Sequence, residues 1–300
     1  MTTEDDFFAD LFRRLPAFPA AVVIPPGDDC AAVAWGENRL LLLAVDQVVG
    51  DRHYVSRGEL ATPPRLAGRK LLARNLSDIA AMGGTPTLCL LAGAFAKDRD
   101  EAWLRDFYDG IIALAAEYGV SMVGGDFAAT PHDDVASLTI IGEVAADQVV
   151  RRSGARPGDQ LFATGCFGDS FASQHHLLFT PRCAEGQWLA QQHLARAMMD
   201  VSDGLLRDAA RICAASNVGL TLDLEAVPRR GRATLEQACG DGEDFELIFA
   251  VPPERAPSLA AGWPFAGTPL TRLGEFTAAT GLWDPSGQPL AVTGWDHFVF

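Results

Sequence analysis

The chain has 300 residues, of which 48% are hydrophobic and 21% are charged, and its formal net charge is −15. This composition is typical of a globular protein with room for two ordinary domains, and it excludes a disordered chain. The negative charge argues against binding to nucleic acid or to an anionic membrane surface, because no net positive field would attract phosphate groups. Two interpretations of the acidity stay open: simple solubility, or an anionic ligand that is neutralised by divalent cations.

The cysteines and the N-terminal residues indicate the cellular compartment of the protein. The six cysteines are scattered and form no CxxC pair, which fits a reduced cytoplasmic protein better than a disulfide scaffold or a zinc site. The chain begins Met1-Thr-Thr-Glu-Asp-Asp, which is acidic where a signal peptide would be basic, and no apolar run reaches the length of a bilayer. We therefore expect a cytoplasmic protein with no membrane partner.

Helices and strands alternate in the first half of the chain. Helical spacing of apolar residues predicts helices over residues 4–15, 65–82 and 101–118. Short apolar runs predict strands over residues 40–45, 87–95, 120–123 and 136–144. This alternation predicts an α/β or α+β fold, with sheet covered by helices.

A polar, turn-rich stretch at residues 151–159 predicts a boundary between two domains, residues 1–150 and 151–300. After this stretch the pattern restarts, with strands predicted over residues 160–164, 219–224 and 245–251 and helices over residues 169–178 and 203–216. His175 and His176 lie on the first of these helices, and we expect both at the surface.

Aspartates recur where apolar segments end. Asp46 and Asp126 each follow a predicted strand. Asp200 follows the apolar run Ala197-Met-Met, and Asp203 stands three residues on, at the start of a predicted helix. Two further aspartates complete the set: Asp29 in a Pro/Gly-rich turn after Asp28, and Asp78 in a largely apolar helix.

Such placements predict a metal site. Carboxylates at strand ends point into the crevice where α/β proteins bind ligands, and carboxylates packed together repel unless a cation joins them. Mg²⁺ prefers oxygen ligands and often shares them with phosphate groups, so aspartates with few histidines or cysteines nearby favour Mg²⁺ over zinc. Taken one at a time, each aspartate is more typical of a turn or a helix cap than of a metal ligand, and it is the six placements together that favour the metal site.

The familiar phosphate-binding sequences are absent. The chain contains no GxxxxGK[ST] and no GxGxxG, so neither the Walker A loop nor the protein-kinase loop applies. The segment Gly165-Cys-Phe-Gly-Asp-Ser170 could hold an anion at the start of a helix, but a tight strand-to-helix turn explains it better.

In order along the chain, the segments resemble the thiamine-monophosphate kinase family, which shares a superfamily with aminoimidazole ribonucleotide synthetase and selenophosphate synthetase. The matching segments span nearly the whole chain: Gly27-Asp-Asp-Cys-Ala31; Val45-Asp46 with His53-Tyr54; Lys70-x4-Asn75-Leu-Ser-Asp-Ile-Ala-Ala-Met-Gly-Gly-Thr-Pro86; Gly124-Gly-Asp126; Arg152-Ser-Gly-Ala-Arg-Pro-Gly-Asp159; Gly165-x-x-Gly-Asp-Ser170; Asp200-Val-Ser-Asp-Gly-Leu205; Gly242-Glu-Asp-Phe-Glu-Leu247; and Trp295-Asp-His-Phe298.

The resemblance implies two α/β domains of the aminoimidazole ribonucleotide synthetase type, in a homodimer whose N-terminal domains build a barrel. It implies an enzyme that phosphorylates thiamine monophosphate with ATP and several Mg²⁺ ions, without a catalytic base because the acceptor phosphate is already anionic. The implied metal ligands are Asp29, Asp46, Asp78, Asp126, Asp200 and Asp203. The implied ATP contacts are Gly125, Asp126, Arg152, Ser202 and Tyr108, and the implied contacts to thiamine monophosphate are His53, Glu243 and Phe298.

Several positions depart from the family pattern. Ala44-Val45 precedes Asp46 where the family has hydroxyl residues, Phe127-Ala128 replaces Thr-Thr after Asp126, and the segment between Ser170 and Asp200 is shorter. Two alternatives therefore stay open: a divergent relative that uses ATP and Mg²⁺ on another small phosphorylated or amide substrate, and a non-catalytic nucleotide-binding protein. Without the resemblance, Glu243 would be interpreted as a solvated loop acid and Phe298 as a core aromatic.

Overall fold

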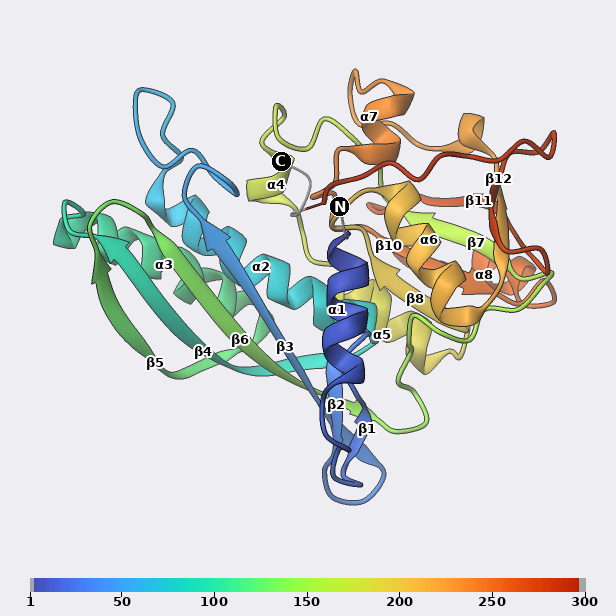
Figure 1. The fold of residues 1–300 in the computed structure, drawn as a ribbon, viewed down its shortest axis with the longest axis horizontal. Helices are drawn as coiled ribbons and strands as arrows, with labels where there is room; N and C mark the ends of the chain where they lie inside the picture. Colours follow the sequence, from blue (N-terminus) through green and yellow to red (C-terminus); the bar gives the residue numbers. More distant parts are fainter. Residues whose placement is uncertain (1–2, 297–300) are drawn as a thin grey trace.

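The computed structural model describes residues 3–296, which form two six-stranded sheets with the long helix α2 (Pro64–Ala81) between them (Figure 1). The first sheet has the order β1 (Val22–Ile24), β2 (Ala31–Ala34), β3 (Arg39–Val49), β6 (Val135–Ala145), β4 (Thr85–Ala96) and β5 (Ser121–Thr130). Neighbouring strands are antiparallel except β4 and β5, which are parallel.

One face of this sheet carries the first core. Alternate residues of β6 are buried, as expected of a strand with one covered face. They pack with α2, which lies against β3 and β6, and with α3 (Glu101–Tyr118), which lies against α2. The two helices approach closely, because a Cβ atom at Gly68 would lie 1.9 Å from the carbonyl oxygen of Phe107. Edge strand β5, in contrast, is exposed along almost its whole length.

The second sheet is covered on both faces. Its order is β12 (Gly281–Trp283), β9 (Gly219–Leu222), β11 (Leu270–Thr277), β7 (Gln160–Thr164), β10 (Leu247–Val251) and β8 (Ala197–Asp200). Every residue of β10 is buried, because one face packs with α6 (Leu205–Ser216) and the other with α5 (Cys183–Gln191) and α8 (Ala256–Gly262). The remaining helices are α1 (Glu4–Arg13), α4 (His175–Leu178), η1 (Leu224–Ala226) and α7 (Leu235–Gly240).

Helix α2 joins the two halves, since it contacts α4, α5 and strand β8 of the second half as well as the first sheet. At its contact with α5 a Cβ atom on Gly186 would lie 2.1 Å from the carbonyl oxygen of Ala80, so only glycine lets the two helices approach this closely. The predicted domain boundary at residue 150 falls between β6 and β7 and stays a prediction.

The predicted mixed α/β architecture with helix-covered sheets is confirmed, and three predictions of local structure are wrong. Strand β3 continues to Val49 and strand β5 to Thr130, so Asp46 and Asp126 lie within strands and do not follow them. The helix predicted over residues 169–178 is reduced to the four residues of α4. Asp169 and Gln174 both have positive φ, a conformation that a right-handed helix excludes. None of the helices in the described part of the chain is both long and apolar enough to span a bilayer.

Candidate metal and substrate site

Three of the six predicted aspartates converge at the junction of the two halves. Asp29 lies in the turn between β1 and β2, Asp78 on α2, and Asp200 at the end of β8. Each offers a carboxylate oxygen, and these oxygens all lie within 4.8 Å of one another. Packing of α2 against β8 therefore brings together acids that are up to 171 residues apart in the sequence (200 − 29).

The cluster is electrostatically costly without a cation. Burial, and next the charge of Asp29, raise the pKa of Asp200 to about 8, although the hydroxyl of Ser77 donates a hydrogen bond to it. Burial and the charges of Asp46 and Asp200 raise the pKa of Asp78 well above its usual range. One carboxylate oxygen of Asp29, Oδ2, is buried and accepts no hydrogen bond within the described residues.

These features fit a divalent cation. Clustered oxygen donors, one of them without a partner, are the ligands that Mg²⁺ takes in proteins. A cation would offset both causes of the two raised pKa values, the burial of the carboxylates and their mutual repulsion. We therefore assign Asp29, Asp78 and Asp200 as candidate ligands for Mg²⁺.

Arg152, a predicted ATP contact, borders the cluster. Its Nη2 donates to Oδ1 of Asp29 at 2.7 Å, and its backbone N–H donates to Asp28. Burial, followed by the charge of Asp29, raises the pKa of Asp28 to about 6. The guanidinium is thus held where it could reach a phosphate group that is bound at the cluster.

The other three predicted metal ligands lie outside this cluster. The carboxylate of Asp46 is paired with Arg74 at 2.9 Å, and that of Asp203 with Arg211 at 2.6 Å. Asp126 and its neighbour Gly125 lie on the exposed edge strand β5. Tyr108 is half-buried on α3 and packs against the first core.

A cavity of about 660 Å³ opens near the cluster, since Arg74, one helical turn before Asp78, and Asp203, three residues after Asp200, line it. It brings together predicted residues from both halves. His53, Ser202 and Glu243 all line it, together with Arg52 and Arg74. The backbone N–H of Ser202 donates to Asp208 at 3.0 Å. Phe298, the third predicted substrate contact, lies outside the described residues.

Glu243 is not a solvated loop acid. Its Oε2 accepts a hydrogen bond from Nζ of Lys70 at 2.7 Å, and its Oε1 accepts one from Arg74 at 3.4 Å. Burial raises the pKa of Glu243, but a hydrogen bond with His176 and the charges of Lys70 and Arg74 outweigh it and lower that pKa to about 2. This carboxylate therefore stays ionised and ties α2 to the second half of the chain.

Family models match both halves of the chain. Residues 27–144 match the AIR synthase related protein N-terminal domain, and residues 150–282 match the C-terminal domain of the same family. The thiamine-monophosphate kinase of Rhodopirellula baltica is 36% identical over 298 residues, which cover 93% of this chain and 91% of the relative. That of Escherichia coli K12 is 34% identical and covers 99% of this chain and 98% of the relative.

The chain belongs to the AIR synthase related family, in its thiamine-monophosphate kinase branch.

Solved structures agree with this family. A structure described as AaThiL complexed with AMPPCP and TMP superposes with a TM-score of 0.81 at 26% identity, covering 99% of this chain and 97% of that chain. The thiamine-monophosphate kinase of Stenotrophomonas maltophilia superposes with a TM-score of 0.76 at 29% identity, covering 95% of this chain and 96% of that chain. The two aminoimidazole ribonucleotide synthetase-type domains that the resemblance implied are therefore confirmed.

The structure also places residues at the site that sequence reasoning missed. Ser77, Arg74 and Lys70 all lie on the α2 segment that carries the family resemblance, so that segment was the available signal. His176 was predicted at the surface, but only 3% of it is exposed. Its imidazole stacks on the ring of Phe171, and its Nδ1 lies 2.8 Å from Nζ of the buried Lys70.

Proposed function

We propose that this chain transfers the γ-phosphoryl group of ATP to thiamine monophosphate, giving thiamine diphosphate and ADP. Full-length relatives at 36% and 34% identity are thiamine-monophosphate kinases, and a similar structure is described as a complex with AMPPCP and TMP. The observation that carries the proposal is the convergence of Asp29, Asp78 and Asp200 beside a cavity that is large enough for a small phosphorylated acceptor.

Mg²⁺ bound by this cluster would neutralise the phosphate groups and hold the two anionic reactants in line. The chain's own residues supply position and charge. Arg152, held by Asp29, would bind the phosphates of ATP. Arg74, which lines the cavity and is fixed by Asp46 and Glu243, would face the phosphate of the acceptor. No side chain needs to remove a proton, because a phosphate monoester is largely ionised near neutral pH.

The remaining residue roles rest on the resemblance and are part of the same proposal. Asp46, Asp126 and Asp203 would complete the metal site, and Gly125, Tyr108 and Ser202 would contact ATP. His53, Glu243 and Phe298 would contact thiamine monophosphate.

We further propose a homodimer that forms through the first sheet. Edge strand β5 leaves its backbone and its apolar side chains open, including Val123 at 56% exposure and Phe127 at 55%. An open edge of this kind is a template for pairing with another strand, and a second copy of the chain would cover it. A cytoplasmic location is part of the proposal, since the six cysteines form no disulfide within residues 3–296.

The test is an assay of ADP and thiamine diphosphate with purified protein, ATP, Mg²⁺ and thiamine monophosphate. We expect product from the complete mixture, none with thiamine as acceptor, and none with EDTA. Asp200→Asn should lower the rate by at least about 100-fold, because one of the three clustered carboxylates is lost. Asp133→Asn, which changes an exposed carboxylate outside the cluster, is the matched control and should keep full activity. A folded wild-type protein that forms no product would reject the proposal.

A further inference from the structure

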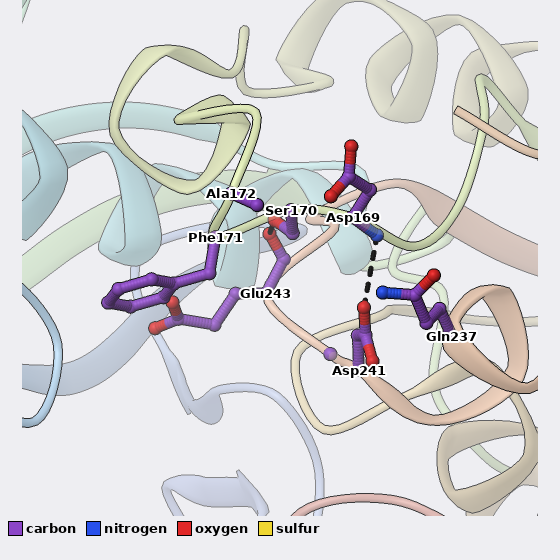
Figure 2. Close-up of a pocket in the computed structure, with 8 residues that line it drawn as sticks. Asp169, Ser170, Phe171, Ala172, Gln237, Asp241 and Glu243 are labelled. Carbon is purple, nitrogen blue, oxygen red and sulfur yellow. Dashed lines mark hydrogen bonds between the residues drawn. The ribbon is translucent and has the colours of Figure 1, made fainter. Parts of the chain in front are cut away.

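Phe171 presents an aromatic ring to the cavity although nothing in the proposed reaction uses it. The side chain is 50% exposed and belongs to the short loop that replaces the predicted helix before α4. It lines both the 660 Å³ cavity and an adjoining cavity of about 280 Å³. In Figure 2 its ring extends away from the loop beside the side chain of Glu243. A large apolar ring left open on a cavity wall is typical of a contact surface for a ligand.

The ring is held from behind by buried groups. Phe171 stacks on the imidazole of His176 with ring centroids 4.1 Å apart and planes 14° from parallel. His176 in turn lies 2.8 Å from Nζ of Lys70, whose side chain is fully buried. The neighbouring Ser170 donates its hydroxyl to the carbonyl oxygen of Glu243. One face of Phe171 is therefore fixed against the protein, and the ring is available to stack on a second planar group.

Carboxylates without cationic partners line the same cavities as this ring. Asp241 lines both cavities and accepts the backbone N–H of Asp169 at 3.0 Å. Within residues 3–296, neither the carboxylate of Asp169 nor that of Asp241 is paired with a lysine or an arginine. Figure 2 shows Asp169, Asp241 and Gln237 gathered on the side of the loop away from the Phe171 ring. This end of the cavity is negative, whereas Arg52 and Arg74 supply positive charge to the same cavity.

A ligand that complements both features has a planar cationic ring at one end and an anionic group at the other. Aromatic rings attract cationic heterocycles more strongly than neutral ones, because the negative face of the ring adds to stacking. Unpaired carboxylates favour the same charge. The thiazolium ring and the phosphate of thiamine monophosphate have this distribution of charge.

We propose that Phe171 stacks on the thiazolium ring of the acceptor and that Asp241 supplies the counter-charge, so that the two residues form its specificity-determining subsite. The inference rests on the proposed function and names the subsite that selects the acceptor. Lys70 and His176 are positioning residues for this subsite, since they hold the rear face of Phe171.

Calorimetric titration with thiamine, which carries the ring but no phosphate, tests the subsite separately from catalysis. We expect Phe171→Leu to weaken thiamine binding about tenfold and Phe171→Tyr to preserve it, because a tyrosine ring keeps the stacking surface. Asp241→Asn should weaken binding about threefold at low salt and less at high salt. In the kinase assay the same variants should raise KM for thiamine monophosphate and leave KM for ATP unchanged. Trp35→Leu, which removes an aromatic side chain of similar exposure outside both cavities, should change neither quantity.

Two outcomes separate the subsite from the reaction. If the wild-type enzyme makes thiamine diphosphate but Phe171→Leu binds thiamine as tightly as wild type, the subsite is wrong and the function stands. If the wild type binds thiamine through Phe171 yet forms no product, the function is wrong and the subsite stands. Should Phe171→Leu lower the unfolding midpoint, Phe171→Met takes its place, because the longer side chain still covers His176; unchanged thiamine affinity in that variant overturns the inference.

Discussion

Replacing Asp200 by asparagine is expected to stabilise the metal-free protein while it abolishes the response to Mg²⁺. Asp200 is 3% exposed, and it shares its surroundings with Asp29 and Asp78. Asparagine has nearly the same shape, and its amide oxygen can still accept the hydrogen bond from Ser77. The substitution therefore removes the ionisable group at this position and changes little else.

The size of the effect follows from the pKa of this carboxyl. It rises from an ordinary value of 3.8 to about 8 in the folded chain, chiefly through burial and next through the charge of Asp29. Between these two values the folded state holds a proton that the unfolded state has released. The free energy of unfolding therefore decreases as the pH rises, by about 1.4 kcal/mol per pH unit, or about 3 kcal/mol between pH 5 and pH 7. Asparagine does not titrate, so its contribution to this slope is zero.

Urea unfolding at pH 5, 6 and 7, with EDTA or with Mg²⁺, measures the prediction. In EDTA we expect the free energy of unfolding to fall more steeply with rising pH for the wild type than for Asp200→Asn. Between pH 5 and pH 7 the two losses should differ by about 3 kcal/mol. Addition of Mg²⁺ should restore the wild type at pH 7 and have little effect on the variant, because binding to the folded state alone stabilises it. Asp134→Asn is the matched control. Asp134 is equally buried but paired with Arg99, so losing its charge should destabilise the protein at every pH.

Two results would refute this reasoning. Parallel pH slopes for wild type and Asp200→Asn in EDTA would mean that Asp200 carries no unusual proton. A variant that Mg²⁺ stabilises as strongly as wild type would mean that the ion binds elsewhere.

Three further predictions concern the contacts around the site. Lys70→Met should lower the free energy of unfolding by about 3 kcal/mol, because it leaves the buried charge of Glu243 with one cation fewer. Urea unfolding measures this loss. The double variant Lys70→Met, Glu243→Gln should lose less stability than the two single variants added together, and additive losses would contradict the pairing. Phe127→Asp should convert the dimer to a monomer, because it places charge on the exposed edge strand β5; light scattering after gel filtration measures the mass, and a dimeric variant would disprove the interface. Gly186→Ala should destabilise by about 2 kcal/mol or more, because its Cβ atom would meet a backbone oxygen of α2 at 2.1 Å. Gly267→Ala meets nothing within 4 Å and is the control for thermal unfolding, where equal midpoints for the two variants would contradict the contact.

Much of the fold could be predicted from the sequence because its signals are local. Helical periodicity located α2 and α3 to within one residue at each end, since caps and apolar spacing are properties of neighbouring residues. Strand ends were less accurate. Strands β3 and β5 continue past the apolar runs from which they were predicted. Backbone pairing with a neighbouring strand extends each of them through residues that are not part of such a run.

The residues of the site could be predicted from the sequence, but their ion-pair partners could not. The aspartates and the family motifs were visible as residue types in order along the chain, and three of the predicted metal ligands do converge. Sequence could not tell that Arg74 and Arg211 would take the carboxylates of Asp46 and Asp203. An ion pair of this kind depends on which side chain lies nearest in the folded chain, and the sequence gives no measure of that distance.

The sequence alone therefore determined the class of fold, the family and the acidic character of the site, because each is carried by local patterns and by residue identity. Only the tertiary structure decided that α2 packs against the first sheet and also against α4, α5 and β8 of the second half. Packing of α2 against β8 and α5 brings Ser77 to Asp200 and Lys70 to Glu243, which are 123 and 173 residues apart. Contacts over such separations form only when the two sheets assemble on one helix, and they hold the carboxylate cluster and the cavity side by side.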